Sequence, residues 1–107
     1  PGLQTLDLSC NLLTVLQEGT FKGLTSLVDL NMGSCQLRQL PPEGFAGLAS
    51  LKIVDLGCNQ LQQLPDNIFG GLEKLEKVDI SVNNLNALPS GCFAGLPSFK
   101  QVKLGVN

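Results

Sequence analysis

Residues 51–74 read LKIVDLGCNQLQQLPDNIFGGLEK, and variants of this 24-residue pattern fill the rest of the chain without an insertion. A period of this length predicts a solenoid, in which each repeat buries its apolar side against its neighbours. We therefore expect a single repeat array over residues 1–107, without capping units. Its repeats are residues 3–26, 27–50, 51–74 and 75–98, followed by a partial repeat at 99–107.

The first part of each repeat predicts a strand. Segments such as Val78-Asp79-Ile80 alternate apolar and polar residues, which is the period of a strand with one buried face. One such strand per repeat predicts a parallel sheet along one side of the solenoid. Position nine of the repeat follows the strand and is usually asparagine, whose carboxamide can bond backbone groups left unpaired at the turn. These residues are Asn11, Asn59, Asn83 and Asn107.

The second repeat has Cys35 in place of this asparagine. A thiol is a weaker hydrogen-bond donor and acceptor than a carboxamide, so we expect a weaker link between the repeats there. The return segment of each repeat carries leucines at fixed positions, and Pro41, Pro65 and Pro89 argue against a long helix in it. One phenylalanine also recurs in every full repeat, and we interpret this column as core rather than as a ligand stack. Its members are Phe21, Phe45, Phe69 and Phe93.

These columns together resemble a known repeat family. The pattern L-x-x-L-x-L-x-x-N-x-L-x-x-L-P-x-x-x-F-x-x-L is closely similar to leucine-rich repeats of the typical 24-residue class. The resemblance is carried by Leu6-Asp7-Leu8-Ser9 with Asn11, and by Leu88-Pro89-Ser90-Gly91 before Phe93. It implies an α/β repeat solenoid curved into a horseshoe arc. The parallel sheet would then be concave, and the irregular convex side would carry a spine of stacked phenylalanines.

The same resemblance carries expectations about function. Repeats of this class are similar to those in the ectodomains of Toll-like receptors, small matrix proteoglycans, neuronal adhesion proteins and the variable lymphocyte receptors of jawless fish. It therefore implies an extracellular or cell-surface protein with a role in innate immunity or cell adhesion. A cytoplasmic location is the alternative, because the cysteines are expected to be free thiols.

The cysteine spacing favours four free thiols over an intrachain disulfide. Cys10 and Cys58 occupy the same repeat position two repeats apart, which places them about 9–10 Å apart, beyond the reach of an unstrained bridge. Cys35 is expected to point inward and Cys10 outward, while Cys92 stands alone on the return side. The chain contains no C-x-x-C pair, so neither a zinc knuckle nor thioredoxin-type redox chemistry is indicated.

Composition argues against several classes of function. The net charge is −2, and no basic stripe is present to bind nucleic acid. No apolar run reaches the roughly 18 residues that a transmembrane helix needs, so we expect no membrane insertion in this segment. Histidine is absent, which removes Cys–His and Ser–His catalytic pairs. We expect neither an enzyme nor a cofactor or metal site.

We place the candidate ligand-binding surface on the outward positions of the strands. It comprises Asp7, Asp29, Asn31, Lys52, Ile53, Asp55, Glu76, Lys77, Asp79 and Lys103. Neighbouring strands lie about 4.8 Å apart, so Asp55 and Asp79 should be side by side. This pair suggests a strip for a basic partner or a weak cation site, although two carboxylates supply too few oxygens for Ca²⁺. Alternatively, these aspartates are simply soluble strand residues whose charge is offset by Lys52 and Lys77.

An apolar shoulder borders this surface and is formed by Val28, Ile53, Val82 and Val106. Taken together, the sequence predicts a non-catalytic protein–protein recognition module, part of a receptor or adhesion ectodomain, that binds a protein ligand through its concave sheet. Two alternatives remain open: a structural spacer whose surface binds nothing, and an intracellular leucine-rich-repeat scaffold.

Overall fold

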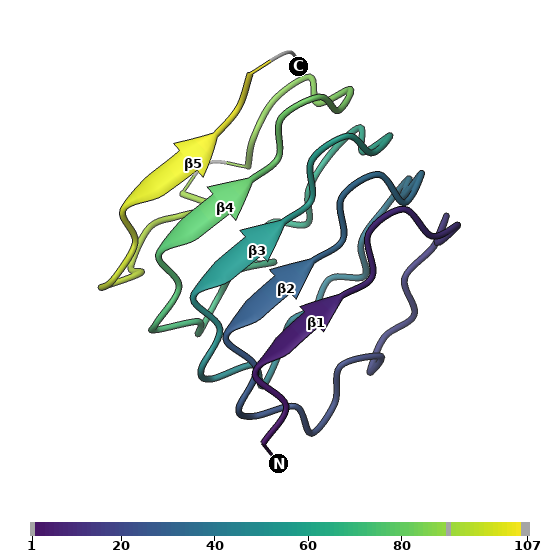
Figure 1. The fold of residues 1–107 in the computed structure, drawn as a ribbon. Coiled ribbons are helices and arrows are strands. Elements are labelled where there is room, and N and C mark those ends of the chain that lie inside the picture. The colour runs from purple at the N-terminus through teal and green to yellow at the C-terminus, as the bar shows by residue number, and fades with distance from the viewer. Residues whose placement is uncertain (1, 90, 106–107) are drawn as a thin grey trace.

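The structure, a computed structural model, describes residues 2–89 and 91–105, and its regular elements are five short strands. They are β1 (Thr5–Asp7), β2 (Asp29–Asn31), β3 (Ile53–Asp55), β4 (Lys77–Asp79) and β5 (Gln101–Lys103). The strands form one parallel sheet in sequence order, as Figure 1 shows. Each strand pairs with residues 24 positions further along the chain, so that Leu6 is opposite Leu30 and Leu30 is opposite Val54. The expected solenoid with a parallel sheet is confirmed.

Backbone pairing between repeats extends beyond these three-residue strands. The Lys52 carbonyl accepts the N–H groups of Glu76 and Lys77 at 2.8 and 3.0 Å, just before β4 begins. After β3 ends, the Leu56 and Cys58 N–H groups donate to carbonyls of the following repeat, at 2.7 and 2.9 Å. Hydrogen bonds between neighbouring repeats therefore extend beyond the three-residue strands and satisfy backbone groups from position two to position eight of each repeat.

The return side of the solenoid is built of turns. Among the described residues no helix is present, so the helical part of an α/β solenoid is not represented and the convex side is irregular, as the prolines predict. Gly47 and Gly71 adopt φ values of +86° and +79° in these turns, a conformation that favours glycine. The chain thereby returns to the sheet within each 24-residue repeat.

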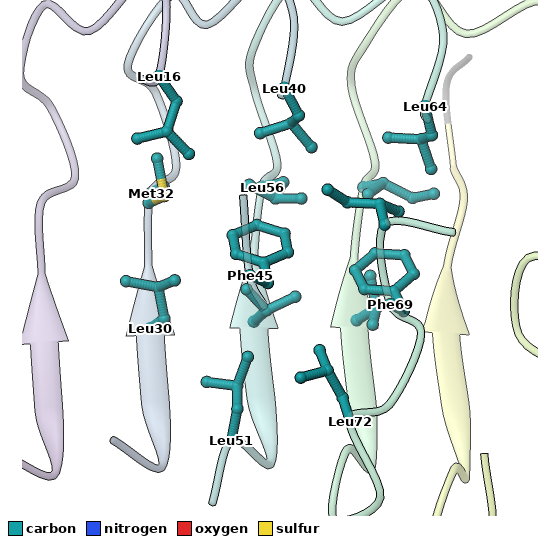
Figure 2. Packing of buried hydrophobic residues seen from close by; sticks show 14 of the residues in the cluster. Leu16, Leu30, Met32, Leu40, Phe45, Leu51, Leu56, Leu64, Phe69 and Leu72 are labelled. Atoms are coloured by element: carbon teal, nitrogen blue, oxygen red, sulfur yellow. The ribbon is translucent and has the colours of Figure 1, made fainter. Parts of the chain in front are cut away.

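The core runs the length of the solenoid between the sheet and the return segments. Leu30, Val54 and Val78 are fully or almost fully buried beneath successive strands. Figure 2 shows Leu16, Leu40 and Leu64 in a row parallel to that of Phe45 and Phe69. Because the same column in each repeat packs on its neighbours, the apolar residues form one continuous cluster rather than separate cores.

The phenylalanine spine is also confirmed. Successive rings stack with nearly parallel planes, and the distances between their centroids are 6.2 Å from Phe21 to Phe45, 6.1 Å from Phe45 to Phe69 and 5.3 Å from Phe69 to Phe93. The first three rings are buried, which supports a core role, while Phe93 is half-buried. Phe99 occupies a position where the other repeats have leucine, and its ring stacks on Phe93 at 4.6 Å. The spine is therefore one ring longer than the repeat pattern predicts.

Candidate binding surface

The outward residues at position five of the repeat are held by the turn that follows each strand. The Oδ1 atom of Asp55 accepts the Gly57 N–H at 2.8 Å, and Asp79 Oδ1 accepts the Ser81 N–H at 2.9 Å. Asn31 makes the same bond to Gly33. Each side chain thus closes a local turn and is fixed in orientation. This role was not predicted, although the sequence carries a signal for it: an Asp or Asn is followed two residues later by Gly or Ser.

Asp7 has the same geometry in the first repeat. Its carboxylate accepts both the hydroxyl and the backbone N–H of Ser9. These bonds favour the charged form, so the Ser9 hydroxyl, followed by the Ser9 N–H, holds the pKa of Asp7 below its ordinary value of 3.8. Asp7 is exposed, so its contribution here is local orientation rather than core stability.

Asp55 and Asp79 lie side by side, as the repeat spacing predicts. They are paired in the register of β3 and β4, and both carboxylates approach Gly57. A Cβ atom at Gly57 would lie 3.1 Å from Asp55 Oδ1 and 3.4 Å from Asp79 Oδ1. The absence of a side chain at this position therefore allows the two carboxylates to approach one another across a single glycine.

The lysines do not offset this pair by direct contact. Within residues 2–89 and 91–105, one ion pair is present, between Lys100 and Glu76 at 3.7 Å. Both of its side chains are partly exposed, so it contributes little to stability. Neither Lys52 nor Lys77 is within salt-bridge distance of Asp55 or Asp79 in this part of the chain.

A shallow hollow of about 170 Å³ lies over β3, β4 and β5. Five of the ten predicted surface residues line it, namely Ile53, Asp55, Lys77, Asp79 and Lys103. The other five lie outside its lining, namely Asp7, Asp29, Asn31, Lys52 and Glu76. Ile53 is 37% exposed and contributes an apolar wall. Val54, Val78 and Gln101 complete the lining. The hollow, which we call the sheet hollow, thus combines two carboxylates and two ammonium groups with the exposed aliphatic side chain of Ile53.

The apolar shoulder is only partly formed. Val82 is 46% exposed and Ile53 is exposed to a similar degree, whereas Val28 is half-buried. Val106 lies outside the described residues. Val82 also has an unusual backbone, because its φ is +56°, a left-handed conformation that β-branched residues rarely adopt. Position eight has this conformation in the first three repeats as well, at Cys10, Ser34 and Cys58.

The asparagines of position nine link neighbouring repeats beneath this surface. Buried Asn59 accepts the Cys35 and Leu37 N–H groups, each at 2.9 Å, and donates to the Met32 carbonyl at 3.0 Å. Asn83 repeats the pattern with Leu61 and Leu56. Asn11 is exposed, and its side chain donates to the Leu8 and Ser9 carbonyls of its own turn. Asn107 lies outside the described residues.

Cys35 retains half of the asparagine's function. Its thiol donates to the Leu8 carbonyl of the preceding repeat at 3.1 Å. It has no side-chain carbonyl to receive the Leu13 N–H, so the Cys35 backbone carbonyl accepts that group instead, at 2.9 Å. The local backbone differs accordingly, because Gln36 adopts a φ of +59° and its counterparts in later repeats do not. The weakened side-chain link is therefore compensated by a rotated peptide.

All four cysteines are free, in agreement with the sequence prediction. Cys10 and Cys58 are exposed, whereas Cys35 and Cys92 are buried. Burial raises the pKa of the Cys92 thiol, which keeps it protonated and unreactive at neutral pH.

A sequence model of the leucine rich repeat matches residues 1–57 and 49–107, which together span the chain. The chain belongs to the leucine-rich-repeat family. These repeats form a non-catalytic fold for protein interactions. Among solved structures, the chain is similar to one chain of the Toll–Spatzle complex, a molecular hub in Drosophila development and innate immunity. The two share 31% sequence identity and superpose with a TM-score of 0.90.

That superposition covers 95% of this leucine-rich-repeat chain and 14% of the chain in the Toll–Spatzle complex. No curated protein sequence matches. Within the part of the chain that the structure describes, no helix has the length and apolar character that a bilayer crossing requires.

Proposed function

We propose that this chain is a non-catalytic recognition module from a receptor or adhesion ectodomain, and that it binds a protein ligand through its concave sheet outside the cell. Membership of the leucine-rich-repeat family supports a role in protein interaction. The similarity to a chain in a complex of Toll with Spatzle supports an extracellular receptor setting. The observation that carries the proposal is the sheet hollow, where Asp55 and Asp79 converge beside exposed Ile53.

The hollow predicts the chemistry of the ligand. Asp55 and Asp79 are held by their turns, so their side chains would lose little conformational entropy when a partner binds. Carboxylates in a fixed orientation suit an arginine guanidinium, which can bond two oxygens at once. Lys77 and Lys103 border the pair and favour acidic residues on either side of that arginine. Ile53 provides an apolar contact for the arginine stem or for a neighbouring aliphatic side chain.

The proposal is tested with a variant that removes charge but keeps the turns. The double variant Asp55→Asn/Asp79→Asn retains Oδ1 as an acceptor for Gly57 and Ser81, as Asn31 does for Gly33. Its matched control is Asp7→Asn/Glu73→Gln, which removes two exposed carboxylates that lie outside the lining of the hollow. Wild type and both variants are used to capture cross-linked partners from extracellular and cytosolic fractions of the cells of origin.

We expect an extracellular partner that wild type and the control capture and that the Asp55→Asn/Asp79→Asn variant loses. Capture of the same partner by all three proteins would mean that the sheet hollow is not the binding site. A partner found only in the cytosolic fraction would favour the intracellular scaffold, and no specific partner in either fraction would favour the structural spacer.

A further inference from the structure

The return side, away from the sheet, also carries surface hollows. The largest is a hollow of about 860 Å³ between the return segments of the second and third repeats. Hollows of about 470 Å³ and 280 Å³ lie on either side of it, toward the first and fourth repeats. The central hollow shares Gln39 and Leu40 with one neighbour and Gln63 and Leu64 with the other. The three therefore form one trough along the solenoid, which we call the return-side trough.

The trough has an apolar floor and polar walls. Leu16, Leu40 and Leu64 form the row visible in Figure 2, and each is at most 5% exposed. The Gln39 and Gln63 side chains are exposed along the walls and present both amide donors and carbonyl acceptors. Such groups match the alternating N–H and C=O groups of an extended peptide backbone.

The charged side chains that line the trough are all acidic. Glu18, Glu43 and Asp66 are exposed lining residues, and they supply one carboxylate from each of three successive repeats. No lysine or arginine lines any of its three hollows in the described part of the chain. Lys22 lines a smaller adjoining hollow that shares Glu18 and Glu43, but among the described residues it forms no ion pair with either carboxylate. A partner that fills the trough therefore needs positive charge to match the carboxylates.

The spacing of the repeats suits an extended chain. On the return side, successive phenylalanine rings are 6.2 and 6.1 Å apart, which measures the distance from one repeat to the next. An extended peptide advances about 3.3 Å per residue, so its alternate side chains are about 6.6 Å apart. Side chains at every second residue of such a peptide would thus meet successive repeats. Each of these repeats presents one carboxylate, at position 16 for Glu18 and Asp66 and at position 17 for Glu43.

We propose that the return-side trough binds an extended peptide segment of a partner protein that carries lysine or arginine at every second residue. This site shares no lining residue with the sheet hollow, so it can operate alongside the concave surface. The peptide backbone lies along the glutamine side chains, and its basic side chains point to Glu18, Glu43 and Asp66.

The test is an NMR titration of the ¹⁵N-labelled chain with a 12-residue peptide of alternating lysine and threonine. A peptide with six lysines followed by six threonines has the same composition and charge but the wrong spacing. We expect saturable shifts in residues 39–46 and 63–70 with the alternating peptide, and binding several-fold weaker with the block peptide. Shifts in Asp55, Gly57 and Asp79 instead would place the peptide on the sheet and overturn the proposal.

The variant Glu18→Gln/Glu43→Gln/Asp66→Asn removes the three carboxylates, and the spectrum itself reports whether it folds. We expect its dissociation constant for the alternating peptide to rise about tenfold, since three exposed ion pairs are lost. The matched control Asp29→Asn/Glu73→Gln/Glu76→Gln makes the same change in net charge elsewhere and should bind within twofold of wild type. Equal weakening in both variants, equal binding of both peptides, or no saturable binding by wild type would refute the trough as a peptide site.

Discussion

The backbone of Val82 provides a test of whether position eight of the repeat is strained. Val82 has a φ of +56°, and such left-handed conformations cost an L-residue roughly 1–2 kcal/mol. Asparagine tolerates this conformation better than other residues with a side chain, because its short amide bonds locally. Replacing Val82 by Asn should therefore recover much of this strain.

The substitution also loses some burial, which sets the net effect. Val82 is 46% exposed, so about half of the ~1.5 kcal/mol gained by fully burying a valine is lost when Asn replaces it. Recovering most of about 1.5 kcal/mol of strain leaves a net stabilisation of about 0.5–1 kcal/mol. For a domain of this size, that change raises Tm by about 2–8 °C.

Val15 offers a matched control. It is 49% exposed, almost the same as Val82, but its φ is not positive. Val15→Asn therefore loses similar burial without relieving strain, and it should destabilise the chain by about 0.7 kcal/mol. Urea unfolding followed by far-UV circular dichroism measures both variants, provided that the m-value is unchanged. If Val82→Asn destabilises the chain as much as Val15→Asn does, the left-handed conformation is not strained and the reasoning is wrong.

Three further predictions concern single side chains. Asn83→Ala should destabilise the chain by about 2–4 kcal/mol in urea unfolding, because removal of the buried amide leaves several backbone groups unpaired. Asn11→Ala, at an exposed site, should cost less than about 1 kcal/mol. Cys35→Asn restores the missing side-chain carbonyl and should raise stability by about 1 kcal/mol in the same assay, while a loss would mean that the rotated peptide is the better solution. Ser9→Ala should raise the pKa of Asp7 toward 3.8, measured by carboxyl NMR titration. Because the folded-state pKa of Asp7 is depressed, its bonds to Ser9 favour the folded chain above pH 3.8, and this contribution is lost as pH falls through the folded-state pKa. An unchanged Asp7 titration in the Ser9→Ala variant would exclude Ser9 as the cause of the depressed pKa.

The sequence was sufficient for the fold because the repeat determines the environment of each column. A residue at position four or six of an internal repeat is covered by its counterparts in the adjacent repeats, so Leu30 and Val54 are buried for the same reason. The same logic predicts the stacking of Phe45 on Phe69. It fails where a repeat departs from the pattern: the ring of Phe99 extends the spine, and the peptide after Cys35 rotates. Both outcomes depend on three-dimensional adjustment to an unusual side chain, which a periodic pattern cannot encode.

The candidate surface was harder to predict because one residue type has two roles there. The outward position of Asp55 and Asp79 follows from strand alternation, and their charge was the only property from which a role was predicted. In the structure, one oxygen of each carboxylate closes the following turn, a role that the uncharged Asn31 performs equally well. The negative charge at these two positions is therefore not required by the turn.

This separation of roles decides how the surface must be tested. An alanine or lysine at Asp55 removes both the turn acceptor and the charge, so a loss of binding would not distinguish local misfolding from loss of a recognition site. An asparagine removes only the charge, because it preserves Oδ1 for the Gly57 N–H. A partner that still binds the asparagine variant but not the alanine variant recognises the shape of the turn, whereas a partner lost in both recognises the carboxylate. The turn geometry of Asn31 in the neighbouring strand makes this comparison possible within the same sheet.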